Sequence, residues 1–188
     1  MVALRDRDET GPSLLIDRVE SPLGPILLVA EGDGLRALEF GDDEDRLLRD
    51  VRRQEGAAVG FAHTDDPAGL SSRLRAYFAG DVEVFDDVPV RAGGTPFQRV
   101  VWAALREIPP GRTTSYGQLA ARLGRPGASR AVGLANGANP VAIAVPCHRV
   151  IGADGTLTGY GGGLERKRWL LEHERACLAA AGRSTSLL

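Results

Sequence analysis

Short apolar runs alternate with turn-forming residues through the first ninety residues, a pattern typical of a small sheet. Strands are predicted over residues 14–20, 25–31 and 34–40, the first two joined by Ser21-Pro22-Leu23-Gly24 as a hairpin turn. The spacing then becomes helical. It predicts a surface helix over 42–54, a second helix over 67–79 with Tyr77 and Phe78 in its core-facing stripe, and a turn with a short strand over 81–90.

The second half has the spacing and punctuation of helices. Thr95-Pro96 reads as a cap and first position of a helix that continues to Ile108, and Pro109-Pro110-Gly111 ends it. A short helix capped by Thr114 or Ser115 is predicted to reach residue 123, followed by a glycine-containing turn over 124–127 and a third helix over 128–136. Two short helices across such a turn indicate a helix-turn-helix, and a last helix is predicted over 165–180.

These elements predict an α+β protein of two domains. An N-terminal domain of a three-stranded sheet with helices covers residues 1–90, and a linker runs to about 94. A mostly helical, winged-helix-like domain with the helix-turn-helix covers 95–178, and a flexible tail is expected over 179–188. The length of 188 residues suits one medium domain or two small ones.

Charge is distributed unevenly between the two halves. Residues 1–90 carry 10 basic and 20 acidic side chains, which gives a net charge of −10. Residues 91–188 carry 13 basic and 5 acidic side chains, which gives +8, and the two halves sum to −2. This asymmetry favours a second half that meets a polyanion. The charged N-terminus shows no signal peptide, and no apolar run is long enough for a membrane span, so we expect a cytoplasmic protein.

The chain contains two cysteines, Cys147 and Cys177, which supply neither a disulfide framework nor a four-ligand metal set. One of them lies in Pro146-Cys147-His148-Arg149-Val150, beside a basic and a cationic side chain. A thiol attacks as the thiolate, and such neighbours favour ionisation. For an arbitrary Cys-His pair, a buried strand with an inert cysteine is the more frequent explanation.

That pentapeptide resembles the active-site signature of the O6-alkylguanine-DNA alkyltransferases, also called methylated-DNA–protein-cysteine methyltransferases, most closely their bacterial stand-alone type. Four further blocks resemble the family in order and spacing: Arg130-Ala131-Val132-Gly133, Ala135-Asn136-Gly137-Ala138-Asn139-Pro140, residues 157–164 and residues 168–174. The resemblance implies a ribonuclease-H-like N-terminal domain. It also implies DNA repair by irreversible, single-turnover transfer of the alkyl group from O6-alkylguanine, and from O4-alkylthymine, to the protein.

The resemblance assigns catalytic roles to five residues. Cys147 would be the nucleophile, activated through a bridging water by His148, which Glu174 would orient. Adjacent residues of an extended chain point to opposite sides, so no direct Cys147–His148 contact is expected, and the thiol pKa is expected below its ordinary value. Tyr116 would donate to the leaving base, and Asn139 would pin the turn between the recognition helix and an active-site strand. No cofactor or metal is implied, and a monomer acting on double-stranded DNA is expected.

The third predicted helix is unusually small on one face, which suits close approach to a narrow minor groove. In the family, this helix docks there, and Arg130 would fill the gap left by a flipped nucleotide. The resemblance implies DNA contacts by Ser115, Tyr116, Arg130, Ala131, Gly133, Ala135 and Asn136, and a base pocket lined by Val150, Tyr160 and Gly161. Gly161 departs from family members that carry a serine there.

Blander explanations stand beside these assignments. Ala131 and Ala135 could pack against the preceding helix, Tyr116 could be a core-edge residue, and Glu174 could be an exposed helix carboxylate. Whole-protein alternatives are a non-enzymatic binder of alkylated DNA, a helix-turn-helix transcription regulator and a Cys-His hydrolase. Relatives that only bind lesions lack the reactive cysteine, a regulator would need more base-reading side chains, and hydrolases place the histidine far from the cysteine in sequence.

Overall fold

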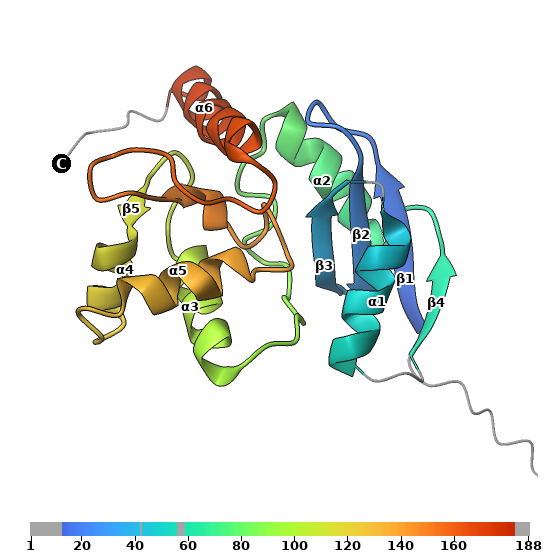
Figure 1. Cartoon of the computed structure of the whole chain (residues 1–188). Coiled ribbons are helices and arrows are strands. Elements are labelled where there is room, and N and C mark those ends of the chain that lie inside the picture. Colours follow the sequence, from blue (N-terminus) through green and yellow to red (C-terminus); the bar gives the residue numbers. More distant parts are fainter. Residues whose placement is uncertain (1–12, 42, 56–58, 183–188) are drawn as a thin grey trace, which may run out of the picture.

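The computed structural model describes residues 13–41, 43–55 and 59–182, so the predicted tail from 183 onward and the charged N-terminal segment lie outside the described residues. The chain forms the expected α+β architecture, with a sheet and its helices beside a mostly helical part (Figure 1). The sheet order is β3-β2-β1-β4. Its strands are β1 (Ser13–Val19), β2 (Ile26–Glu31), β3 (Gly34–Phe40) and β4 (Gly60–His63).

Alternating side chains of the sheet enter two separate cores. Leu27 and Val29 of β2 face helix α1 (Glu44–Glu55) and pack with its Leu47 and Val51. Residues of the opposite parity, such as Leu28, pack with helix α2 (Leu70–Ala79) and with the helical part of the chain. Figure 1 shows the two helices on opposite faces of the sheet. One face of the sheet therefore packs within the N-terminal half, and the other face also packs against the second half of the chain.

The N-terminal half differs from the predicted pattern in three places. β4 adds a fourth strand, parallel to β1, that the sequence did not indicate. The predicted helix over 67–79 begins as a 3-10 turn, Pro67–Gly69, and only α2 (Leu70–Ala79) is α-helical, because Ala68 and Gly69 have φ of 51° and 73°. Residues 81–90 form turns, and only Val90 makes an isolated bridge, to Leu35.

The helix-turn-helix forms as its capping residues predict. Helix α3 (Pro96–Arg106) starts with a capping box between Thr95 and Gln98, and α4 (Tyr116–Arg122) starts with another between Ser115 and Gln118. Helix α5 (Ser129–Gly137) follows a turn in which Gly124 and Gly127 have φ of 69° and 92°. A side chain is strained at such angles, so both glycines are needed for the tight reversal.

The cysteine motif lies on a tight turn and not on the extended strand that the sequence suggested. Cys147–Arg149 is a 3-10 turn, η2, and the chain becomes extended only in β6 (Val150–Ile151). β6 pairs in parallel with β5 (Thr114–Ser115), the segment that caps α4. This small pairing holds Tyr116, the first residue of α4, next to the chain leaving the cysteine.

The last helix, α6 (Leu164–Ala180), crosses the top of the molecule in Figure 1 and contacts both halves. It continues past residue 178, so Ala179 and Ala180 belong to the helix and not to the expected tail. The sheet also contacts the loop before the cysteine motif, because Leu38 N–H donates to Pro140 O at 2.9 Å and Ala142 N–H donates to Leu38 O at 2.8 Å. No helix in the described part of the chain is long and apolar enough to cross a bilayer.

Candidate active site

Cys147 lies at the inner end of a cleft between the two halves. Its side chain is buried, and it is one of the residues that line a cavity of about 640 Å³. The sheet domain contributes Phe40 and Arg46 to the same cavity, and the helical domain contributes Asn139 and Tyr160. The thiol therefore borders a space large enough for a nucleobase.

The loop before the thiol is held in an unusual conformation. Asn139 Nδ2 donates to Val145 O at 2.8 Å, and its Oδ1 accepts from Val141 N–H at 3.0 Å, so one amide spans the loop. Between these residues, Ile143 has φ of 70°, which is a genuine outlier for a β-branched residue. Such strain persists only where the surroundings over-determine the backbone, and the Asn139 amide and the edge of β3 supply that constraint.

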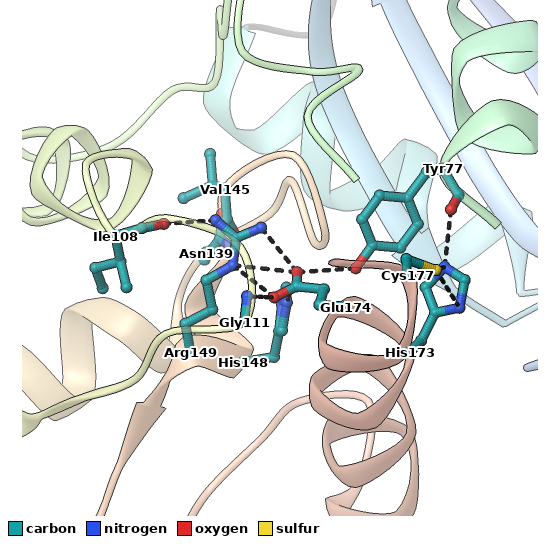
Figure 2. Close-up of polar contacts among 10 residues, drawn as sticks. All are labelled: Tyr77, Ile108, Gly111, Asn139, Val145, His148, Arg149, His173, Glu174 and Cys177. Atoms are coloured by element: carbon teal, nitrogen blue, oxygen red, sulfur yellow. Dashed lines mark hydrogen bonds and ion pairs between the residues drawn. The ribbon is translucent and has the colours of Figure 1, made fainter. Parts of the chain in front are cut away.

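Glu174 is the centre of a buried polar cluster (Figure 2). It is 0% exposed, and its Oε1 lies 2.9 Å from His148 Nε2. Arg149 donates to both carboxylate oxygens, with Nη2 at 2.7 Å from Oε1 and Nε at 3.1 Å from each oxygen. Gly111 N–H donates to Oε2 at 2.9 Å, and the Tyr77 hydroxyl donates to Oε1 at 3.0 Å. The alternative of an exposed helix carboxylate is therefore wrong.

The charge states within this cluster follow from its contacts. Burial alone would raise the pKa of Glu174, but the His148 and Arg149 donors outweigh it and hold the pKa of that carboxyl well below its usual range. Burial lowers the pKa of His148, against the pull of Glu174, so the imidazole is neutral at neutral pH. An ionised carboxylate only accepts, so His148 carries its proton on Nε2, and Nδ1 has the free lone pair.

His148 Nδ1 is buried and has no hydrogen-bond partner among the described residues. It is therefore the basic atom of the cluster. Burial raises the pKa of the Cys147 thiol, although the amide of Asn139 and the ammonium of Lys167 oppose this. The expectation of a lowered thiol pKa is thus wrong for the free protein. The physical reason is desolvation, which disfavours the thiolate more than its neighbours favour it.

Lys167 ties down the segment that closes the site. It is the only lysine of the chain and is 0% exposed. Its Nζ donates to Val150 O at 2.6 Å and to Thr158 O at 2.7 Å, which joins β6 to the loop before α6. The Tyr116 hydroxyl donates to the same Thr158 O at 3.4 Å. Tyr116 is thus a half-exposed residue over the site, and burial raises the pKa of its phenol, so it stays a donor.

The predicted DNA contacts divide into surface and interior residues. Arg130 and Ala131 are exposed on α5, and Gly133 is half-buried beside Tyr116. Ser115 is half-buried as the cap of α4. The side chains of the other two predicted contacts, Ala135 and Asn136, are buried in the structure.

The interior positions of those two residues have their own reasons. Trp102 Nε1 donates to the carbonyl of Ala135 at 2.8 Å, so this small residue allows α5 to pack closely on α3. Ala135 thus packs against α3, which is not the helix directly before α5, whereas Ala131 is exposed. Asn136 Nδ2 donates to Cys147 O at 3.4 Å, which joins the end of α5 to the thiol turn.

The predicted base-pocket residues are also divided. Tyr160 and Gly161 line the same cavity as Cys147. The side chain of Val150 is buried, and its carbonyl accepts from Lys167 Nζ.

Two family models match the chain, one in each half. Residues 96–176 match the DNA binding domain of 6-O-methylguanine DNA methyltransferase, and residues 15–92 match its ribonuclease-like domain. The chain belongs to the 6-O-methylguanine DNA methyltransferase family. This methyltransferase chain is 55% identical over 165 residues to the methylated-DNA–protein-cysteine methyltransferase of Salmonella typhimurium, covering 86% of this chain and 95% of the relative. It is 50% identical over 161 residues to the protein of that name from Mycobacterium tuberculosis, covering 84% and 90%.

Solved methyltransferase structures have the same fold. The Mycobacterium tuberculosis O6-methylguanine methyltransferase matches with a TM-score of 0.72 at 44% identity, covering 87% of this chain and 93% of that one. A structure described as Mycobacterium tuberculosis OGT in complex with DNA matches with a TM-score of 0.71 at 43% identity, covering 88% and 94%.

Sequence reasoning missed two polar residues of this methyltransferase site. Lys167 carried a signal, since a single lysine among 23 basic residues of an otherwise arginine-rich chain stands out. Tyr77 was assigned to core packing, and its ring does pack in the core, but its hydroxyl reaches Glu174. No local signal could reveal that contact, because 97 residues separate the two partners.

Proposed function

We propose that this methyltransferase repairs DNA by transferring the alkyl group of O6-alkylguanine directly to Cys147, once per protein molecule. One observation supports this proposal above all. The Cys147 thiol lines the cavity, and the next residue of the turn, His148, is hydrogen-bonded to the buried carboxylate of Glu174. Burial keeps the thiol protonated at rest, and the imidazole beside it is neutral with a bare Nδ1. The site is therefore arranged to ionise the thiol when a substrate is bound.

The transfer is one displacement. Cys147 Sγ attacks the alkyl carbon, the carbon–O6 bond breaks, and the electron pair of that bond stays on the guanine. The thiol proton passes to His148 Nδ1 through a water, and the Tyr116 hydroxyl donates a proton to the leaving base. The protonated His148 then gives up its extra proton to solvent and Tyr116 takes one from solvent, which restores both side chains. Overall, the proton of the thiol is replaced by the alkyl group, and unmodified guanine receives one proton. The product is a thioether, which has no route back, so the reaction is irreversible.

The DNA partner is recognised through the helix-turn-helix of the positively charged half. Chemistry on a paired base requires that the nucleotide leave the stack, and Arg130 projects from the exposed face of α5 where it would fill the gap. Ser115, Tyr116, Ala131 and Gly133 form the rest of the DNA-facing set. The buried hydroxyl of Tyr160, which has no partner among the described residues, would bind the flipped base together with the backbone at Gly161.

Several finer features belong to the same proposal. The chain acts as a monomer in the cytoplasm, where the reducing environment preserves the thiol. O4-alkylthymine is a second substrate, since its alkyl carbon is presented on an equivalent oxygen. Residues 1–90 form the sheet domain and 95–178 form the alkyl-transfer and DNA-binding domain.

A transfer assay with O6-methylguanine duplex tests the proposal. We expect the methyl group to leave the DNA with a limit of one per protein, because nothing regenerates a thioether. Cys147→Ser should abolish transfer while it retains DNA binding, and Cys177→Ser is the matched control that should transfer normally. Several turnovers per protein, or full transfer by Cys147→Ser, would refute the proposal.

A further inference from the structure

A tyrosine of the sheet domain reaches the charged cluster of the other domain. Tyr77 lies near the end of α2 and is 1% exposed. Its hydroxyl donates to Glu174 Oε1 at 3.0 Å, and its carbonyl lies 2.8 Å from His173 Nε2 (Figure 2). One residue of α2 therefore contacts two successive residues of α6 through two different polar atoms.

Aromatic packing fixes the position of this tyrosine ring. The ring centroid lies 5.4 Å from that of His173 and 6.4 Å from that of Phe85. His173 in turn stacks on Trp169 at 4.7 Å and 15°. The interface between α2 and α6 is thus an aromatic cluster, and the Tyr77 hydroxyl is the polar end that the cluster aims at Glu174.

The hydroxyl shares one carboxylate oxygen with the base. Oε1 of Glu174 accepts from His148, from Arg149 and from Tyr77. The backbone N–H of Gly111 faces the other oxygen. Burial raises the pKa of Tyr77 well above its ordinary value, with the Glu174 charge acting in the same direction, so the phenol remains a donor throughout the working range.

We propose that Tyr77 is a positioning residue through which the N-terminal domain sets the basicity of His148. By donating to Oε1, the hydroxyl draws carboxylate charge away from the imidazole that shares this oxygen. The same bond holds the Glu174 side chain from the side opposite Arg149. The sheet domain, which contains no cysteine, thereby takes part in the proton transfer. The catalytic consequence rests on the proposed role of His148 as the base.

The direction of the effect follows from the charges around the imidazole. His148 is faced by Glu174, which favours its protonated form, and by the cations of Arg149 and Lys167, which oppose it. Removal of the Tyr77 hydroxyl leaves the carboxylate ionised, because Arg149 and Gly111 still donate to it. More of its charge then acts on His148, so the imidazolium becomes more stable and its pKa rises.

The test compares two full-length variants. Tyr77→Phe keeps the ring and removes only the hydroxyl, whereas Phe85→Leu weakens the same aromatic cluster and keeps the hydroxyl. NMR titration of the His148 ring should show a pKa higher by about 0.5 unit in Tyr77→Phe, a fraction of the value of one hydrogen bond to a charged group. Phe85→Leu should leave that pKa unchanged while it lowers stability.

The alkylation rate gives an independent reading. Below the midpoint of the pH–rate profile with free O6-benzylguanine, Tyr77→Phe should react about threefold more slowly, which is the rate equivalent of 0.5 pKa unit. An unchanged His148 pKa in Tyr77→Phe would overturn the proposal. Should Tyr77→Phe not fold, 3-fluorotyrosine at position 77 is the second variant. As a stronger donor it should lower the pKa of His148, and an unchanged or raised value would overturn the proposal equally.

The two proposals fail in distinguishable ways. A shifted His148 pKa with an unchanged pH–rate profile would support Tyr77 as the positioning residue and would remove His148 as the base. If instead the protein transfers methyl groups normally but His148 titrates identically with and without the Tyr77 hydroxyl, the proposed function stands and the role of Tyr77 is refuted.

Discussion

Replacement of Glu174 by glutamine is expected to cause a large loss of stability, and the size of this loss can be estimated from the structure. The substitution preserves the shape of the side chain and removes its charge. Every group that faces the two oxygens is a donor, from Tyr77, Gly111, His148 and Arg149. A glutamine amide would therefore place an NH₂ group against donors on one side, and it would leave the guanidinium of Arg149 without a counter-charge.

The expected loss of stability is that of a broken buried ion pair. Arg149 is only 5% exposed, so water cannot solvate its charge once the carboxylate is removed. Removing one partner of such a pair costs about 3–5 kcal/mol. For a chain of this size, about 2–4 °C of Tm corresponds to each kcal/mol, so Glu174→Gln should lower the Tm by roughly 6–20 °C.

The pH dependence has a definite sign. The folded-state pKa of Glu174 is depressed below its unfolded value of 4.5, so its contribution is fully present above that value and is lost as the pH falls. The stability difference between wild type and Glu174→Gln should therefore be constant near neutral pH and shrink in acid. His148, with a depressed pKa, also binds its proton more readily when unfolded, so acid destabilises the wild type through both groups.

Thermal and urea unfolding at pH 7 and in acid measure this prediction. Glu172→Gln is the matched control, because Glu172 is an exposed carboxylate on the same helix, and it should change stability by less than about 0.5 kcal/mol. The rate of alkylation by Glu174→Gln should fall most near neutral pH and recover toward alkaline pH, where the thiol ionises unaided. A stability loss below about 1 kcal/mol, or wild-type rates across the pH range, would contradict the placement of Glu174 at the centre of the cluster.

Three further predictions concern DNA and the closing loop. Arg130→Ala should slow repair in duplex DNA much more than reaction with free O6-benzylguanine, since base extrusion costs a few kcal/mol, and equal losses on both would show that Arg130 supports the fold instead. Affinity for undamaged duplex should fall with salt with a log–log slope of about −0.9 per phosphate contacted, and a salt-independent affinity would contradict binding by the positive half. Lys167→Met removes a cation that opposes the rise in the pKa of Cys147, so the alkylation rate at pH 7 should fall. Arg168→Met is its exposed control, and a wild-type rate in Lys167→Met would rule out this electrostatic effect.

The parts of the fold that sequence predicted are those encoded locally. Thr95 and Ser115 predict the starts of the helices that they cap, and Gly124 and Gly127 predict the turn of the helix-turn-helix. β4 was not predicted because Gly60–His63 is short and lacks a buried face, so its sequence shows no alternation of apolar and polar residues. Its pairing with β1 depends on the parallel return of the chain after α1, which no local pattern encodes.

The site shows the same division between local and long-range information. Cys147 and His148 were identified from one pentapeptide, together with their resemblance to a known signature. The extended conformation assumed for them was wrong, because the 3-10 turn depends on the amide of Asn139 and on the edge of β3. The buried position of Asn136 was likewise invisible, since a helix surface can be assigned only when the packing of its neighbours is known.

Mass spectrometry of the protein after incubation with excess O6-methylguanine duplex shows directly whether Cys147 accepts the methyl group. We predict one added methyl group per chain, carried by the peptide that contains Cys147, together with unmodified guanine in the DNA. A protein that stays unmodified while the lesion disappears, or a methyl group found on Cys177, would contradict it.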